Sequence, residues 1–256
     1  MDLLATFDAQ LRARVPDPLT PGVEVEWDGP ILRLDDPATR GWVLYRTLDV
    51  EGDELDALIQ RQIEWFARRG SRFEWKHHGH DRPADLPARL LAAGFVPEEQ
   101  ETVVAAAVAD VARPVQLPAG VTLREVGDRS DFERIEAMEE AVWGERSHVA
   151  GMLEAEHEAG PDAITIVVAE AGDEVVSAAW IRFERGTDFG TLWGGATLAE
   201  WRRKGIYRAL VAHRANLARE RGFRWLAVDA SDDSRPILER LGFVAVTTTT
   251  PFVWTP

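Results

Sequence analysis

The densest positive charge in this chain lies in residues 201–208, whose sequence is WRRKGIYR. Arg202, Arg203, Lys204 and Arg208 stand within seven positions, at the start of a segment that predicts a long helix. Backbone N–H groups in a first helical turn have no internal partner, and the helix dipole adds partial positive charge there. The stretch therefore predicts a diphosphate site in a glycine-containing nest. Basic residues at a solvated helix start are the alternative, and the G-x-x-x-x-G-K-[ST] phosphate loop is absent.

The chain as a whole is acidic. It has 256 residues, with 29 basic and 44 acidic side chains and a formal net charge of −15, so a general nucleic-acid binder is disfavoured. The absence of cysteine excludes disulfides, thiolate zinc sites and a cysteine nucleophile. The first residues do not resemble a signal peptide, and no apolar run is long enough to span a membrane. We therefore expect a cytoplasmic protein without a nucleic-acid or membrane partner.

Residues 113–120, RPVQLPAG, have two prolines, a glycine and no periodicity, and we place a domain boundary there. The predicted domains are residues 1–115 and 119–256. In the first, the expected order is a helix over 2–14, strands over 22–27, 30–34 and 41–48, a helix over 51–70, a strand over 71–79, a short helix over 84–95 and a strand over 99–111. In the second, it is a strand over 120–126, helices over 130–143 and 148–160, a hairpin over 162–186, a strand over 187–201, a helix over 204–222, a strand over 223–230, a short helix over 234–242 and a closing strand over 243–254.

The two halves share a pattern. A helix ending in ARRG, a strand and RLLAAGFV in the first half match a helix ending in ARERG, a strand and ERLGFV in the second. The same elements recur by chance in many α/β proteins. The glycine-containing ends of the helices occur twice in the same order, however, which favours an internal duplication.

Arg202, Gly205 and Tyr207 occupy the three marked positions of R-x-x-G-x-[GA] at a helix start, and the segment Ala230–Phe243 contains S-R-P-I-L-E-R-L-G-F. This pattern resembles the GCN5-related N-acetyltransferase (GNAT) superfamily over residues 121–254, and residues 41–110 resemble a degenerate second copy. The resemblance implies an α/β fold with a mixed sheet, in two tandem copies of which the first is degenerate.

The resemblance also implies an acyl-CoA-dependent N-acyltransferase that moves acetyl from acetyl-CoA to a primary amine of a small molecule or peptide, by direct attack and without a metal. The pantetheine arm would pair with a strand that splays from its neighbour, and the pyrophosphate would lie on the basic loop. The implied acetyl-CoA-binding residues are Gly195, Ala196, Thr197, Arg202, Arg203, Lys204, Gly205, Ile206, Tyr207 and Arg208.

Two positions depart from the family pattern. Tyr207 stands where a small residue is usual, so it narrows the loop or stacks on the cofactor. Leu238 stands where a tyrosine often protonates the leaving thiolate. Catalytic residues are not identified by the sequence: Glu170 and Asp229, and in the loop after the first helix Glu145 and His148, are possible bases, and for each a surface charge or cap is the commoner role. The acid could be water, Ser231 or no group at all.

Three further groups of residues have more than one interpretation. His77, His78, His80 and Asp81 invite a zinc site, but no fourth ligand has a recognised spacing, and we favour a polar loop, which could lie at the domain interface. Asp229, Asp232 and Asp233 are explained by a solvated loop. Trp193 is expected on the same strand face as Gly195 and Thr197. It could form a wall of the acceptor pocket or belong to the core.

Two competing functions stay open. A noncatalytic acyl-CoA-binding regulatory module would explain Leu238 and the lack of an obvious base. A tandem-domain transferase that uses aminoacyl-tRNA fits poorly with the net charge of −15. The identity of the acceptor and the oligomeric state do not follow from the sequence.

Overall fold

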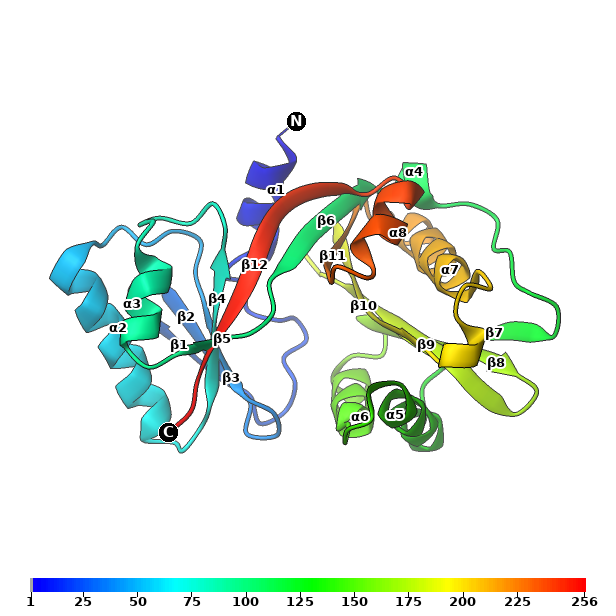
Figure 1. Ribbon diagram of the computed structural model, residues 1–256, viewed down its shortest axis with the longest axis horizontal. Helices are drawn as coiled ribbons and strands as arrows, with labels where there is room; N and C mark the ends of the chain where they lie inside the picture. The colour runs from blue at the N-terminus through cyan, green and yellow to red at the C-terminus, as the bar shows by residue number, and fades with distance from the viewer. Residues whose placement is uncertain (1) are drawn as a thin grey trace.

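The computed structural model describes residues 2–256, and its strands form one continuous mixed sheet of twelve strands (Figure 1). The first half contains α1 (Leu3–Leu11), β1 (Glu24–Asp28), β2 (Ile31–Asp35), β3 (Gly41–Leu44), α2 (Gly52–Ala67), β4 (Phe73–His78), α3 (Leu86–Ala92), β5 (Val96–Pro97), β6 (Glu101–Ala107) and α4 (Val108–Val111). The second half contains β7 (Val121–Val126), α5 (Arg129–Trp143), α6 (Val149–Ala159), β8 (Ile164–Ala171), β9 (Glu174–Phe183), β10 (Phe189–Thr197), the 3₁₀ turn η1 (Ala199–Trp201), α7 (Ile206–Glu220), β11 (Trp225–Ala230), α8 (Arg235–Leu241) and β12 (Val244–Trp254). The predicted mixed α/β fold is confirmed.

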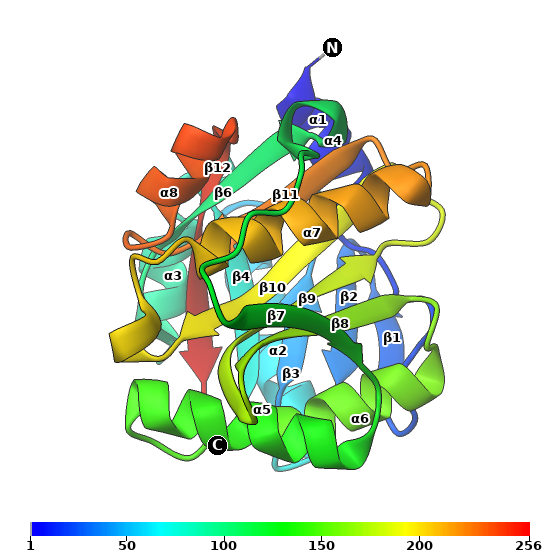
Figure 2. The same ribbon diagram turned by 90° about the vertical axis from the view of Figure 1, so that its right-hand side faces the viewer.

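Helices α2 and α7 occupy matching places in the two halves. Each joins two parallel strands, β3 to β4 and β10 to β11, and such a connection requires a crossover element. Both helices have an apolar stripe, which α2 packs against the first half of the sheet and α7 against the second. In Figure 2, α7 runs across the sheet in front of β10 and β11.

Strands β6 and β12 are exchanged between the halves. β6 comes from the first half but pairs with β11 over residues 102–107. β12 pairs with β6 over residues 244–249 and then continues into the first half, where residues 249–254 pair with β4. Figure 1 shows β12 crossing from one half to the other. The hydrophobic pattern does not predict this exchange, and the sheet passes unbroken across the predicted boundary between residues 1–115 and 119–256, which stays a prediction.

The strand expected over residues 99–111 is shorter in the structure. It ends at Ala107, and Val108–Val111 form the short helix α4. The reason is the partner strand: β11 begins at Trp225, which pairs with Ala107, so later residues have no ladder to join. The N–H of Val108 donates instead to the carbonyl of Arg224, at 2.9 Å.

Helices cover both faces of the second half of the sheet. α5 and α6 pack on one face over β8 to β10, while α7 and α8 pack on the other. α1 lies on the same face as α5 and α6, because its Phe7 contacts Val103 and Ala227 whereas the alternating Val104 faces α7. Residues of α1, α5, α6 and the first half line a common cleft on this face. Among residues 2–256, no helix has the length and apolar character that crossing a membrane requires.

Candidate active site

The two parallel strands β10 and β11 diverge after a short ladder. They pair only from Phe189 with Trp225 to Thr191 with Ala227, yet β10 continues to Thr197 and β11 to Ala230. Along the diverging part, the edges that face each other carry N–H and C=O groups that the partner strand no longer satisfies. The structure therefore has a V-shaped opening between two strands, in the position where the family resemblance places the pantetheine arm.

A bulge shapes β10 inside this V. The register against β9 shifts between Gly194 and Ala196, and both glycines of the bulge have positive φ, +68° at Gly194 and +100° at Gly195. A Cβ on Gly194 would lie 2.5 Å from the ring of Trp180, and one on Gly195 would lie 2.8 Å from the ring of Tyr207. Only glycine fits either position, since both the backbone angles and the space exclude a side chain.

A buried cation supports the strand just before the bulge. Arg214 of α7 is almost wholly buried, and its guanidinium donates to the carbonyls of Trp180 and Trp193, at 2.9 and 3.0 Å. Burial lowers the pKa of Arg214 to about 10, with the nearby Tyr207 acting in the opposite direction. Arg214 thereby ties β9 and β10 to α7 at the level of the bulge.

The basic loop has the geometry of an anion nest. Arg203 and Gly205 both have positive φ, +62° and +92°, and α7 begins at Ile206 without a side-chain cap. The backbone N–H groups of residues 203–208 donate to no acceptor within residues 2–256. The Arg202 guanidinium donates to the carbonyl of Thr197, at 2.9 Å, and so fixes the loop to the end of β10. Six consecutive N–H groups are thus free at the open end of the V.

Tyr207 forms one wall of the V. Its ring packs against Gly195, and burial raises the pKa of its phenol, while the charge of Arg214 and a hydrogen bond with Ser234 act against this rise. The ring lies between the bulge and Ser234, next to the start of α8.

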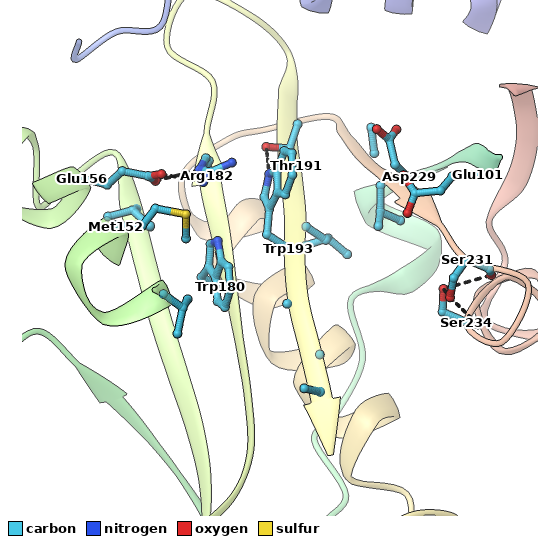
Figure 3. Close-up of a pocket in the computed structure, with 18 of the residues that line it drawn as sticks. Glu101, Met152, Glu156, Trp180, Arg182, Thr191, Trp193, Asp229, Ser231 and Ser234 are labelled. Carbon is cyan, nitrogen blue, oxygen red and sulfur yellow. Dashed lines mark hydrogen bonds and ion pairs between the residues drawn. The ribbon is translucent and has the colours of Figure 1, made fainter. Parts of the chain in front are cut away.

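One cleft of about 2040 Å³ continues from the V across the open face of the sheet and reaches the first half of the chain. Trp193 lies on its surface with 40% of its area exposed. The Arg182 guanidinium stacks 4.3 Å from the centre of the Trp193 ring and forms a two-bond ion pair with Glu156, at 2.7 and 2.6 Å (Figure 3). Trp193 is thus exposed at the cleft and does not belong to the core.

Four charged side chains line the cleft where the halves meet, and we call them the roof cluster. Lys76 of β4 donates to Asp229 of β11, and Glu74 and Glu101 lie within their field. Burial alone would lower the pKa of Lys76, but the charges of Asp229 and Glu74 outweigh it and raise this pKa. Burial and then the charge of Asp229 raise the pKa of Glu101 to about 7.

The structure separates the predicted catalytic candidates. Glu170 lies outside the cleft, in an ion-pair network with Arg124 and Arg134, and the hydrogen bond from Arg124 lowers its pKa. Asp229 and Ser231 line the cleft, with Ser231 hydrogen-bonded to Ser234 at 3.2 Å.

The remaining predicted positions differ in their access to the cleft. His148, before α6, lines the cleft, whereas Glu145 does not. Leu238 is fully buried between α8 and the sheet, so this position provides no acid.

The histidine-rich segment lies where α1 meets the sheet. His80 hydrogen-bonds Thr247 of β12, at 2.8 Å, and Asp8 of α1, at 3.0 Å. His78 is buried, and burial lowers its pKa to about 2. Residues 2–256 contain no group of three or more His, Asp or Glu side chains arranged to hold a metal ion.

Sequence reasoning missed Glu101, Lys76 and Arg214. Glu101 and Lys76 are single charges on strands, and their meeting depends on the strand exchange, which no local pattern indicates. Arg214 stands in the middle of a helix rich in arginine, where a buried and an exposed arginine look alike. Its place four positions after Leu210 on the apolar stripe was the available signal.

Comparisons with known proteins agree with this geometry. Residues 131–243 match the profile of the Acetyltransferase (GNAT) family. A GCN5-related N-acetyltransferase from Kribbella flavida shares the fold over 100% of this chain and 96% of its own, with a TM-score of 0.73 and 18% identity. One from Sphaerobacter thermophilus covers 88% of this chain and 76% of its own, with a TM-score of 0.63 and 16% identity.

A tandem GNAT protein from the clavulanic acid biosynthesis pathway also shares the fold, over 98% of this chain and 92% of its own, with a TM-score of 0.63 and 13% identity. No curated protein matches the sequence. The family profile falls on the half that contains the splayed strands, the bulge and the basic loop. Residues 131–243 therefore match the Acetyltransferase (GNAT) family model, and the chain as a whole has the fold of solved GCN5-related N-acetyltransferases.

Proposed function

We propose that this enzyme transfers acetyl from acetyl-CoA to a primary amine by direct attack in a ternary complex. Two adjacent features carry the proposal. The V between β10 and β11 opens toward residues 203–208, and the six N–H groups of these residues are free. One element accepts an extended arm and the other accepts a diphosphate, which is the combination that coenzyme A presents. The cytoplasmic location expected from the sequence stays part of this proposal.

In this arrangement the pyrophosphate lies on the N–H groups of residues 203–208, with Arg202, Lys204 and Arg208 adding positive charge. The pantetheine arm lies in the V along Gly195–Thr197, with the Tyr207 ring as its wall. The thioester carbonyl then meets N–H groups at the β10 bulge, which polarise it for attack. Because the chain has no cysteine, the acetyl group does not pass through a protein thiol.

The acceptor amine enters from the cleft between the halves. Trp193 offers an aromatic face, and Arg182, paired with Glu156, holds that face in place. Amines of small molecules and of peptides both fit an open cleft of this size. Most of the rate enhancement comes from holding the amine next to the thioester.

We further propose that the first half is a degenerate GNAT copy. Like β10 and β11, β3 and β4 are parallel for only three residue pairs and are joined by a helix. β3 ends one residue after this ladder, however, and buried side chains occupy the space beyond it: the Tyr45 hydroxyl donates to Asp81, at 2.5 Å, and Arg12 pairs with the same carboxylate, at 2.7 Å. The first turn of α2 carries Asp53 and Glu54, which would repel a diphosphate.

A noncatalytic acyl-CoA-binding module remains the second candidate. Leu238 is buried and has no hydroxyl group, so the usual acid position cannot protonate a leaving thiolate. A thiol-release assay with acetyl-CoA and a panel of small amines, amino sugars and peptides separates the two. Release of CoA that depends on one class of amine supports the enzyme. Tight CoA binding in calorimetry, without release for any amine, supports the module.

A further inference from the structure

The strand exchange brings a carboxylate from the first half into the acetyl-transfer cleft. Glu101 begins β6, and β6 lies between β11 and β12 in the sheet. Asp229 pairs with Val103, so Glu101, two residues from Val103, points to the same face of the sheet as Asp229. Thr191 pairs with Ala227, which places Thr191 and Trp193 on this face as well. Figure 3 shows Glu101 beside Asp229, across the cleft from Trp193.

Spacing leaves room for a substrate between Glu101 and β10. β11 lies between β6 and β10, and two strand spacings are roughly 10 Å. Beyond Thr191 the gap is wider, because β10 turns away from β11. An amine that approaches the β10 bulge from the cleft therefore crosses the face of the sheet that carries Glu101.

Charges around Glu101 come from β11, from β4 and from the residues just before β6. Asp229 on β11 and Glu74 on β4 repel its charged form, as does Glu99, while Lys76 on β4 attracts it. β12 places the uncharged Thr249 opposite Glu101. Within residues 2–256 the Glu101 carboxylate accepts no hydrogen bond and forms no ion pair, although it lines the cleft. The lone pairs of the Glu101 carboxylate are therefore free to accept a proton from a molecule in the cleft.

Three other carboxylates near the cleft are already engaged. Asp229 accepts from the Lys76 ammonium, and Glu156 is held by Arg182. Glu139 accepts from the Ser147 hydroxyl, at 3.1 Å. A base must have a free lone pair and must be able to hold a proton near neutral pH, and Glu101 meets both conditions.

We propose that Glu101, delivered by the exchanged strand β6, is the general base that deprotonates the acceptor amine; this inference rests on the proposed acetyl transfer. The acceptor arrives as an ammonium ion, attracted by the surplus of carboxylates in the roof cluster, and gives one proton to Glu101. The free amine attacks the thioester carbonyl, the N–C bond forms and the C–S bond breaks. A second proton passes from the acetylated nitrogen through solvent to the departing thiolate, and Glu101 returns its proton to solvent. The products are the amide, CoA and one proton.

The test compares the pH dependence of kcat/KM for Glu101→Gln, Glu99→Gln and the unaltered enzyme, with the amine that the thiol-release panel identifies. Glu99 is the matched control because it lies on the same approach to β6 and also lines the cleft. We expect Glu101→Gln to lower kcat/KM at pH 7 by roughly 10²- to 10³-fold. The loss should shrink tenfold per pH unit as the free amine becomes available, and CoA affinity in calorimetry should be unchanged. Glu99→Gln should keep the normal rate at its optimum, with the profile moved only slightly toward lower pH, because Glu99 is the last of the charges that raise the Glu101 pKa.

A merely structural role for Glu101 would lower activity equally at all pH values, and that result would overturn the proposal. Equal activity of Glu101→Gln and the unaltered enzyme would also overturn it while leaving the acetyl-transfer function intact. Absence of transfer by the unaltered enzyme to every amine would instead overturn the proposed function, and this inference with it.

Discussion

The guanidinium of Arg214 donates to the main-chain carbonyl of Trp193, at 3.0 Å, one residue before the two glycines of the β10 bulge. The same nitrogen donates to the carbonyl of Trp180 on β9, so one buried cation fixes both strands where their register is about to shift. In the proposed enzyme, the bulge carries the N–H groups that receive the thioester. Arg214 is therefore a positioning residue for the acetyl group, acting through the backbone.

Arg214→Met tests this role. The variant keeps much of the side-chain volume but leaves two buried carbonyls without their donor, and we expect it to lower the free energy of unfolding by about 2–4 kcal/mol. Urea denaturation measures the loss, and calorimetry with CoA should show weaker binding in the folded variant. The matched control is Arg221→Met, which removes bonds to the carbonyl of Asp162 and the hydroxyl of Thr165 and a stacking contact with the Phe183 ring, and should change stability by only about 1 kcal/mol. Equal losses in both variants would contradict the role given to Arg214.

Crowding between Gly195 and Tyr207 makes a second prediction. Gly195→Ala places a Cβ 2.8 Å from the Tyr207 ring at a φ of +100°, and both effects destabilise the fold, together by roughly 2–3 kcal/mol. In a Tyr207→Ala background only the backbone strain remains, so the cost of Gly195→Ala should fall by about 1 kcal/mol in a double-mutant cycle. Gly186→Ala, with a φ of +75° and open space, measures strain alone. Strict additivity would show that the ring does not press on the bulge.

Removing the charge of Glu101 should stabilise the protein above neutral pH. Its pKa rises from 4.5 to about 7 on folding, chiefly through burial and the charge of Asp229. Between these two values the folded state holds a proton that the unfolded state releases, so this stability is present below pH 4.5 and is lost as pH rises through 7. After allowance for solvent at this partly buried side chain, Glu101→Gln should gain about 1 kcal/mol at pH 8 and nothing at pH 4.5.

Denaturation of Glu101→Gln and Glu99→Gln at both pH values checks this expectation. A gain at pH 8 confined to Glu101→Gln would show that an unfavourable charge is kept in the cleft. The same gain at pH 4.5 would mean that the carboxylate destabilises the fold for a reason other than its charge.

Because β6 and β12 are exchanged, we expect each half to need the other in order to fold and stay soluble. Residues 119–256 alone would lack the partner of β11 and would expose an unpaired strand edge. We expect this fragment to aggregate when produced alone and to form a soluble one-to-one complex when produced together with residues 1–115. Analytical ultracentrifugation and thermal melting measure this. A monomeric fragment 119–256 with a cooperative melt would contradict the interdependence.

The sequence predicts the local elements well because they depend on local rules. The apolar stripe and acidic first turn of α2, and the position of α7 after the basic loop, follow from helix periodicity and end signals. The paired glycines at residues 194–195 likewise indicate a bulge, because glycine inside a strand pattern marks an irregular ladder or a close approach. These residues also carry the family resemblance, so the fold and the loop could be predicted together.

Contacts between the halves are not predictable in this way. Whether β6 pairs with β4 or β11 depends on competing long-range pairings with the same alternation of side chains, and local propensity does not choose between them. Lys76 and Asp229 meet only because that choice brings them together. Glu170 shows the converse: its position on the second strand of the family domain made it a candidate, but Arg124 and Arg134 hold it in a network outside the cleft.

Calorimetric titration with CoA of the unaltered protein, Gly205→Glu and Gly222→Glu decides whether the nest at the start of α7 holds the cofactor. Gly205 and Gly222 both have positive φ, +92° and +80°, so the two variants carry similar backbone strain at opposite ends of α7. Glutamate at 205 would put a negative charge into the nest of free N–H groups, whereas glutamate at 222 lies at the far end of the helix. We predict one CoA site per chain, abolished by Gly205→Glu and retained in Gly222→Glu. Binding that survives Gly205→Glu unchanged, or the absence of CoA binding to the unaltered protein, would contradict this assignment.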